Sequence, residues 1–228
     1  MSVALSWSGG KDSALALWEL RRAGIEPVAL LTTVTEDHDR VSMHAVRGEL
    51  LRAQARAVGV PLVEVGIPAA CPNELYEERM RAALEAPPLD AVEEIAFADL
   101  FLADIRAYRE ERLGRIGRRA SFPLWRRDTT ALADEFIAAG FEATLVSVDP
   151  SQLDAAFVGR RFDRTMLAEL PAAVDPCGEN GEFHTFVHAG PIFSAPVGVA
   201  LGETVSRDGF AFQDLLPLSA AAAAAGRS

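Results

Sequence analysis

The segment of the chain with the clearest chemical potential runs from Ser6 to Ser13 and reads Ser-Trp-Ser-Gly-Gly-Lys-Asp-Ser. It lies between a short apolar run and a helical stretch that begins near Asp12. Two adjacent glycines let the backbone turn tightly and approach an anion, and the first turn of a helix offers free N–H groups at the positive end of its dipole. We therefore predict that this segment, the phosphate loop, binds phosphate groups.

The phosphate loop differs from the Walker A loop of P-loop ATPases, which reads G-x-x-x-x-G-K-[ST]. Asp12 follows Gly10 and Lys11, and Leu5 occupies the position of the first glycine. Lys11 is the one lysine among 22 basic residues, and all the others are arginines. A compact ammonium suits a phosphate oxygen at close range better than a wide guanidinium does, so Lys11 is predicted to contact phosphate.

A second polar segment runs from Asp175 to Thr185 and includes Glu179, Asn180, Glu182 and His184 around two glycines. Turns are also rich in Gly, Asn and Asp, so an ordinary turn remains an alternative. A pair of carboxylates in a glycine-rich pocket can hold an ammonium ion or remove its proton. His184 is a candidate acid, base or hydrogen-bond donor.

The sequence does not indicate a metal centre held by protein ligands alone. His184 and His188 lie on a predicted strand, where residues four apart are separated by about 13 Å, too far to share one ion. Cys71 and Cys177 are distant in the sequence and form no C-x-x-C pair. Neither a disulfide framework nor a zinc or iron–sulfur site is therefore predicted.

The phosphate loop resembles the pyrophosphate loop of the N-type ATP pyrophosphatases, the adenine nucleotide alpha hydrolase group. Taken together, the phosphate loop and the Asp175–Thr185 segment resemble one narrower family, the diphthine–ammonia ligases and their bacterial relatives. Phe97-Ala98-Asp99 corresponds to a segment that usually reads Phe-Gly-Asp in that family. Ala98 therefore replaces the usual glycine, and Asp99 is matched. The resemblance covers most of the chain, and its further segments are Ser42–Arg47, Phe97–Leu100, Phe122–Trp125, Val158–Arg160 and Cys177–Glu182.

This resemblance implies that a carboxylate attacks the α-phosphate of ATP, pyrophosphate leaves, and free ammonia displaces AMP to give an amide. Magnesium and the phosphate loop would stabilise charge on the departing pyrophosphate. The implied nucleotide-binding residues are Ser6, Ser8, Gly9, Gly10, Lys11, Asp12, Ser13 and Asp99, of which Asp12 and Asp99 are candidate magnesium ligands. The candidates for catalysis are Lys11, Glu179, Glu182 and His184. The candidates for substrate binding are His44, Arg47, Trp125, Asn180 and Thr185.

Three other functions fit part of the sequence. Phosphoadenylyl-sulfate reductases carry the same Ser-Gly-Gly-Lys-Asp-Ser loop and use a cysteine near the C-terminus, which Cys177 superficially matches, although its Glu-Asn-Gly-Glu surroundings do not. A tRNA-modifying enzyme that inserts sulfur is disfavoured by the acidic charge and the missing cysteine pairs. A non-catalytic sensor of adenine nucleotides also remains open. The carboxylate could belong to a small molecule or a protein, and the arginine-rich, lysine-poor composition indicates a GC-rich bacterium, where diphthine is not expected.

The elements that must position these residues alternate from residue 2 to residue 148. Predicted strands cover 3–5, 27–34, 62–67, 95–97, 121–124 and 143–148. Predicted helices cover 12–23, 46–57, 73–84, 101–116 and 129–139. This alternation predicts an α/β fold, a Rossmann-like (HUP-type) parallel sheet with helices on both faces, whose ligands bind at the carboxyl ends of the strands.

The texture changes after residue 148. A helical stretch is predicted over Ser151–Leu170, and short apolar runs broken by Gly and Pro from Phe183 onward predict hairpins. We therefore expect a nucleotide-binding domain over residues 1–148 and a small α+β domain over residues 149–218 that carries the substrate and ammonia site. Residues 219–228 include six consecutive alanines and are predicted to be a frayed tail.

Composition narrows the class of protein. The chain has 228 residues and a net charge of −11, and half of its residues are hydrophobic, so it can bury a sizeable core. An acidic chain without a basic run is a poor partner for nucleic acid. Its longest uncharged stretch, Ala189–Gly202, contains two prolines and is too short to cross a bilayer. A cytoplasmic protein with no membrane or nucleic-acid partner is expected, and a homo-oligomer is possible.

Overall fold

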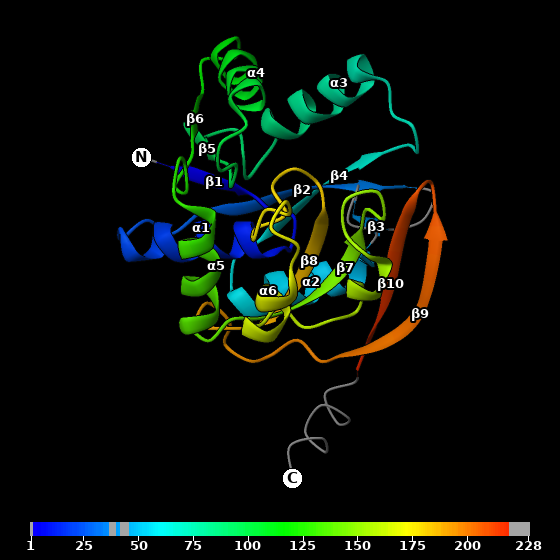
Figure 1. Ribbon diagram of the computed structural model, residues 1–228. Helices are drawn as coiled ribbons and strands as arrows, with labels where there is room; N and C mark the ends of the chain where they lie inside the picture. The colour runs from blue at the N-terminus through cyan, green and yellow to red at the C-terminus, as the bar shows by residue number, and fades with distance from the viewer. Residues whose placement is uncertain (1, 37–39, 42–45, 219–228) are drawn as a thin grey trace.

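The computed structural model describes residues 2–36, 40–41 and 46–218, which form two sheets with helices around the first (Figure 1). Five parallel strands build the first sheet in the order β4 (Leu62–Ile67), β2 (Ala29–Thr35), β1 (Val3–Ser6), β5 (Glu94–Ala96) and β6 (Arg119–Ser121). The two-residue strand β3 (Arg40–Val41) pairs antiparallel with the end of β2. The predicted parallel sheet is confirmed.

Helices cover both faces of this sheet, as the sequence predicts. Helices α1 (Lys11–Arg22) and α2 (Gly48–Val58) lie against one face, and α3 (Asn73–Leu84) and α4 (Ala103–Gly114) lie against the other (Figure 1). Successive side chains along β1 point to opposite faces of the sheet, so they pack in two different hydrophobic clusters. Val3 and Leu5 pack in the cluster that contains α1 and α2, whereas Ala4 packs in the cluster that contains α3 and α4.

The second sheet is antiparallel and has the strand order β8 (Phe183–Ala189), β7 (Glu142–Val148), β10 (Phe210–Pro217) and β9 (Val199–Arg207). Strand β7 corrects one prediction, because residues 143–148 were expected to extend the parallel sheet. Helix α5 (Thr129–Ala138) precedes β7 in the chain. Asp128 caps the N-terminus of α5 by accepting a hydrogen bond from the amide of Ala131 at 2.8 Å. The apolar run of β7 is buried, and apolarity alone does not reveal which strands it pairs with.

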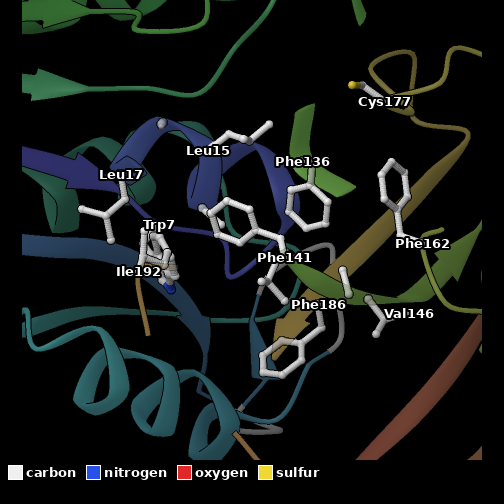
Figure 2. Close-up of a cluster of buried hydrophobic side chains, with 14 of the residues drawn as sticks. Trp7, Leu15, Leu17, Phe136, Phe141, Val146, Phe162, Cys177, Phe186 and Ile192 are labelled. Atoms are coloured by element: carbon white, nitrogen blue, oxygen red, sulfur yellow. The ribbon is translucent and has the colours of Figure 1, made fainter. Parts of the chain in front are cut away.

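Buried aromatic and aliphatic side chains form one cluster that joins α1 and α5 to the second sheet (Figure 2). Phe136 stacks on Phe141 with ring centroids 4.8 Å apart and meets the edge of Phe162 at 5.4 Å. Trp7 of the phosphate loop and Phe186 of β8 belong to the same buried cluster. The phosphate loop is thus packed against the second sheet as well as against the strand and helix that it connects.

Two smaller predictions are also corrected. The helix predicted over Ser151–Leu170 is replaced by turns, a 3-10 helix (Ala155–Phe157) and the short helix α6 (Arg164–Glu169). The strand predicted over residues 121–124 lies earlier, as β6. The predicted hairpin is confirmed as β9 and β10, which are joined at Asp208 and Gly209, both with positive φ. No helix in the described ranges is long and apolar enough to span a membrane.

Candidate active site

The phosphate loop leaves β1 at Ser6 and enters α1 at Lys11. Gly9 has a φ of +78°, which favours glycine, and Gly10 precedes the first residue of the helix. The hydroxyl of Ser13 donates to the carbonyl of Gly10 at 2.9 Å, and the Ser8 and Ser13 hydroxyls lie 3.2 Å apart. These contacts fix the loop at the N-terminus of α1, where the sequence predicts anion binding.

Gln54 is the principal contact of the loop that the sequence interpretation missed. This residue of α2 is completely buried. Its side-chain nitrogen donates to the carbonyl of Gly9 at 2.9 Å and to the carbonyl of Val187, and its oxygen accepts from the indole of Trp7 at 3.1 Å. Gln54 therefore ties α2, the phosphate loop and β8 together. The available signal was a polar residue within the apolar stripe of a helix, flanked by Leu50, Leu51, Ala55 and Val58.

Replacing Gly9 with alanine is expected to destabilise the protein by roughly 2 to 4 kcal/mol and to weaken ATP binding. A Cβ atom there would lie 2.6 Å from Gln54 Oε1 and 2.9 Å from Leu51 Cδ1. Gly24→Ala is a matched control, because Gly24 has a φ of +76° and no atom within 4 Å of its Cβ position. Urea unfolding and ATP titration would measure both effects. Equal losses from the two variants would contradict the crowding of Gly9.

Lys11 connects the phosphate loop to the polar segment near the C-terminus. Its ammonium is buried and donates to Asp12 Oδ2 at 2.9 Å and to the carbonyl of Cys177, and its amide donates to Thr185 Oγ1 at 3.0 Å. Burial lowers the pKa of Lys11, but the attraction and hydrogen bond of Asp12, with smaller contributions from Cys177 and Glu179, outweigh it and raise the pKa overall. Lys11 therefore remains a cation at neutral pH.

Asp12 has the geometry of an incomplete cation site. Its Oδ1 atom is buried and has no hydrogen-bond partner within the described residues. Burial raises the pKa of Asp12, and the nearby Lys11 only partly opposes this. An unpartnered carboxylate oxygen fits a magnesium ion, which typically uses one or two carboxylates and the phosphates of its substrate. In the part of the chain that the structure describes, no group of three or more His, Cys, Asp or Glu residues could hold a metal.

Glu182 organises the polar segment from within. Its Oε1 accepts from the amide of Asp175 at 2.9 Å and from Asn180 Nδ2 at 3.0 Å, and its Oε2 accepts from the amide of Asn180 at 3.0 Å. Gly178 completes the turn with a φ of +66°, and a Cβ there would approach the carbonyl of Phe183 to 2.7 Å. Glu182 was predicted to act on ammonia, but its carboxylate is occupied in shaping this turn.

Glu182→Gln is expected to lower the stability of the protein by about 1 to 3 kcal/mol. The substitution replaces one accepting oxygen with an NH₂ group that faces backbone or side-chain donors. Activity should fall together with the thermal midpoint, because the loop loosens. A variant with an unchanged thermal midpoint and a raised KM for ammonium would instead show that Glu182 contacts ammonia. Differential scanning fluorimetry and ammonium titrations would distinguish these outcomes.

Glu179 is held differently from Glu182. Its Oε1 accepts from the amide of Leu100 at 2.8 Å, which joins the polar segment to the end of the parallel sheet. Partial burial raises its pKa to about 7, although the hydrogen bond from Leu100 opposes the shift. A carboxylate that titrates near neutral pH can take up and release protons under ordinary conditions. Glu179 therefore stays a candidate for proton transfer in this site.

Two further titratable groups lie beside Lys11. Burial, with a contribution from Lys11, lowers the pKa of His184 to about 4, so its imidazole is neutral at pH 7 and retains one N–H donor. Burial raises the pKa of the Cys177 thiol to about 12, and its sulfur donates to the carbonyl of Thr129 at 3.3 Å. A protonated, buried thiol is a poor nucleophile, which argues against the reductase alternative.

A cavity of about 600 Å³ joins the two polar segments. Its walls come from the carboxyl ends of β1, β2 and β5, from α3 and α4, and from the polar segment, as expected for a parallel sheet. A volume of this size is typical of a small-molecule site. The predicted site residues that line it are Ser6, Ser8, Gly10, Lys11, Asp12, Ser13, Asp99, Glu179, Asn180, His184 and Thr185.

The remaining predicted residues do not line the cavity. Gly9 and Glu182 lie outside the lining, where Gly9 contacts Gln54 and Glu182 contacts Asp175 and Asn180. Arg47 forms an ion pair with Asp214 of β10 at 2.6 Å, so it joins α2 to the second sheet. Trp125 packs on Phe122 and on the guanidinium of Arg106. The substrate roles predicted for Arg47 and Trp125 are therefore not supported by their contacts, and His44 lies outside the described residues.

Asp99 lines the cavity but is paired with a cation that the sequence interpretation did not single out. Its Oδ2 lies 2.8 Å from Nε of Arg109, and its Oδ1 accepts from Nη2 at 3.2 Å. Asp99 is thus a less direct candidate for magnesium than Asp12. Arg109 could not be selected from the sequence, because α4 carries three arginines at similar spacing and no pattern shows which of them faces a ligand.

Comparison with known proteins assigns the family. The model of the diphthamide synthase N-terminal domain matches residues 1–122, and that of the diphthamide synthase C-terminal domain matches residues 128–212. A crystal structure described as a "predicted subunit of tRNA methyltransferase" from Methanocaldococcus jannaschii overlaps with a TM-score of 0.40 and 17% identity, covering 74% of this chain and 86% of the other.

Curated relatives agree with the domain matches. Diphthine–ammonia ligase of Danio rerio is 29% identical over 239 residues, which is 90% of this chain and 89% of that protein. The Homo sapiens protein of that name is 27% identical over 236 residues, which is 92% of this chain and 88% of that protein. The Schizosaccharomyces pombe protein is 26% identical over 87% of this chain, which spans only 36% of that longer relative. The chain therefore belongs to the diphthamide synthase family, a family of ligases.

Proposed function

We propose that the protein is an AMP-forming ligase that uses ATP to activate a carboxylate and ammonia to convert it into an amide. The observation that carries this proposal is the junction at Lys11. One ammonium joins a phosphate loop at the N-terminus to a carboxylate-bearing segment near the C-terminus, and both line one cavity. We assign phosphate binding to the loop and ammonia binding to the polar segment, and the contact between Lys11 and Cys177 supports this pairing.

The phosphate loop supplies the nucleotide end of the reaction. We place the β- and γ-phosphates against the loop amides and the hydroxyls of Ser8 and Ser13, at the N-terminus of α1. Lys11 stabilises negative charge on the departing pyrophosphate, an electrostatic task that a buried cation performs well. Magnesium, held by Asp12 and the phosphates, would further neutralise that charge.

The chemistry then needs two bond exchanges. A carboxylate oxygen attacks the α-phosphorus, and the bond to the oxygen that bridges the α- and β-phosphates breaks. Ammonia next forms a C–N bond with the acyl carbon, the bond to AMP breaks, and one proton passes to Glu179. The pKa of Glu179 near 7 suits this transfer, because its carboxylate form is well populated at neutral pH. The neutral imidazole of His184 can donate a hydrogen bond within the same cavity.

Isotope transfer tests the proposed reaction directly. The protein would be incubated with ATP, magnesium, ammonium and a panel of carboxylic acids labelled with ¹⁸O in both carboxylate oxygens. Adenylation followed by amidation transfers one labelled oxygen to AMP, which mass spectrometry detects. Label in inorganic phosphate, with release of ADP, would show a phosphorylated intermediate and overturn the proposal. Binding of ATP without release of AMP or pyrophosphate for any acid would favour the sensor alternative.

A further inference from the structure

The cavity has two chemically different ends. One is built from the phosphate loop and the polar segment, which supply Lys11, Asp12 and Glu179. The other is built from α3 and α4 and from the residue just before α4, and its lining includes Tyr76, Met80, Leu102 and Ile105. The first end meets the requirements of a triphosphate and ammonia. The second end is apolar, and the phosphate chemistry described above does not use it.

Arg109 is the one charged group that α3 and α4 contribute to the cavity within the described residues. Asp99 lies against one edge of its guanidinium: Nη2 donates to Oδ1 at 3.2 Å, and Nε is 2.8 Å from Oδ2 in an ion-pair contact that does not have hydrogen-bond geometry. The guanidinium also stacks over the ring of Phe97, with 4.2 Å between its carbon and the ring centroid. Two neighbours thus fix the plane of this group before any ligand arrives.

The outer edge of the Arg109 guanidinium remains available. Within the part of the chain that the structure describes, Nη1 has no hydrogen-bond partner. An edge with two N–H groups matches the two oxygens of a carboxylate, and the resulting pair of charge-assisted bonds is strong. Burial raises the pKa of the Tyr76 hydroxyl, and the nearby charge of Arg109 only partly opposes this shift. The Tyr76 hydroxyl therefore stays protonated.

On the basis of the proposed function, we propose that the outer edge of Arg109 receives the carboxylate of the acid substrate, and that the apolar wall of α3 and α4 binds its body. The substrate class is a carboxylate on an apolar or aromatic body that carries no second negative charge. Asp99 acts as a positioning residue, because it orients Arg109 and its negative charge disfavours polyanions at this end of the cavity.

Equilibrium binding would test this site without requiring turnover. Calorimetric titrations in the presence of AMP would compare phenylacetate with phenylacetamide, its uncharged analogue, and with succinate, a dianion. The variant is Arg109→Gln. The matched control is Arg112→Gln, because Arg112 also belongs to α4, pairs with Glu77 at 2.6 Å and stacks over Tyr108, yet does not line the cavity.

The expected result is that the unmodified protein prefers phenylacetate to both comparison ligands. Arg109→Gln should weaken phenylacetate binding by about tenfold or more, remove the preference over phenylacetamide, and leave the affinity for ATP within about twofold of its original value. Arg112→Gln should change none of these. Equal binding of acid and amide, or loss of ATP affinity in Arg109→Gln, would overturn the inference.

The outcomes separate this inference from the proposed function. Labelled AMP formed at an unchanged KM for the acid in Arg109→Gln would refute the carboxylate site and leave the ligase intact. Phenylacetate binding that depends on Arg109, in a protein that never releases AMP, would refute the ligase and leave the carboxylate site. A protein that binds none of the three ligands would refute the site.

Discussion

Lys11→Met is expected to reduce AMP formation by about 10²- to 10³-fold, the usual effect of removing one buried group that stabilises transition-state charge. Methionine keeps the length and the apolar stem of the side chain but cannot neutralise the departing pyrophosphate. The substitution should also lower the stability of the protein by about 3 kcal/mol, because Asp12 and the carbonyl of Cys177 lose a buried partner. Acid-dependent exchange of labelled pyrophosphate into ATP would measure the first effect.

A double variant separates chemistry from folding. Lys11→Met with Asp12→Asn removes the buried cation and its partly buried partner together, so we expect it to recover part of the lost stability while exchange stays low. Urea unfolding of the two variants would measure the recovery. If exchange in the single variant remained near the original rate at unchanged stability, Lys11 would have no role in pyrophosphate release.

Glu179→Gln should abolish most amide formation and spare acid-dependent pyrophosphate exchange, because Glu179 is assigned to ammonia and not to ATP cleavage. We expect an effect on amide formation of about 10²-fold or more, typical for loss of a general base. In the unmodified protein, amide formation should rise as pH increases through about 7, as Glu179 loses its proton. Quantification of amide and AMP across this pH range would provide the comparison.

The same carboxyl group makes a separate prediction about stability. Its pKa is about 7 in the folded protein against an ordinary value of 4.5, so the folded state holds the proton more tightly and loses stability as pH rises through this window. Glu179→Gln lacks this penalty. It should therefore be more stable than the unmodified protein by roughly 2 to 3 kcal/mol at pH 8 and about equally stable at pH 4. Greater stability of the unmodified protein at pH 8 would contradict the burial of this charge.

The first sheet and its helices were accessible from the sequence because their signals are local. Strand β4 and helix α3 have the predicted bounds, and α2 ends at Gly59 with a φ of +76°, as its glycine indicates. The failed helix over Ser151–Leu170 also has a local cause. Asp149, Asp154 and Asp163 each accept a backbone N–H bond in a turn or at a helix start, and Gly159 has a φ of +80°.

The site was less accessible because its parts meet through tertiary contacts. The sequence located the phosphate loop and the polar segment, but it could not show that Glu182 turns inward while Glu179 faces the cavity. Both are glutamates in one glycine-rich stretch, and only the folded turn distinguishes them. Gln54 and Arg109 were missed for a related reason, since a single side chain in a helix does not reveal which distant backbone or ligand it meets.

The bonds from Lys11 to Cys177 and Thr185 have a consequence for how the protein is made. The phosphate loop is synthesised before the groups that fix its lysine and its amide, which lie more than 160 residues further along the chain. Domains fold as their sequence emerges, so a nascent chain holds an incomplete loop until β8 has been made. A growing chain should therefore not consume ATP until the segment from Cys177 through β8 has been made and has folded onto the loop.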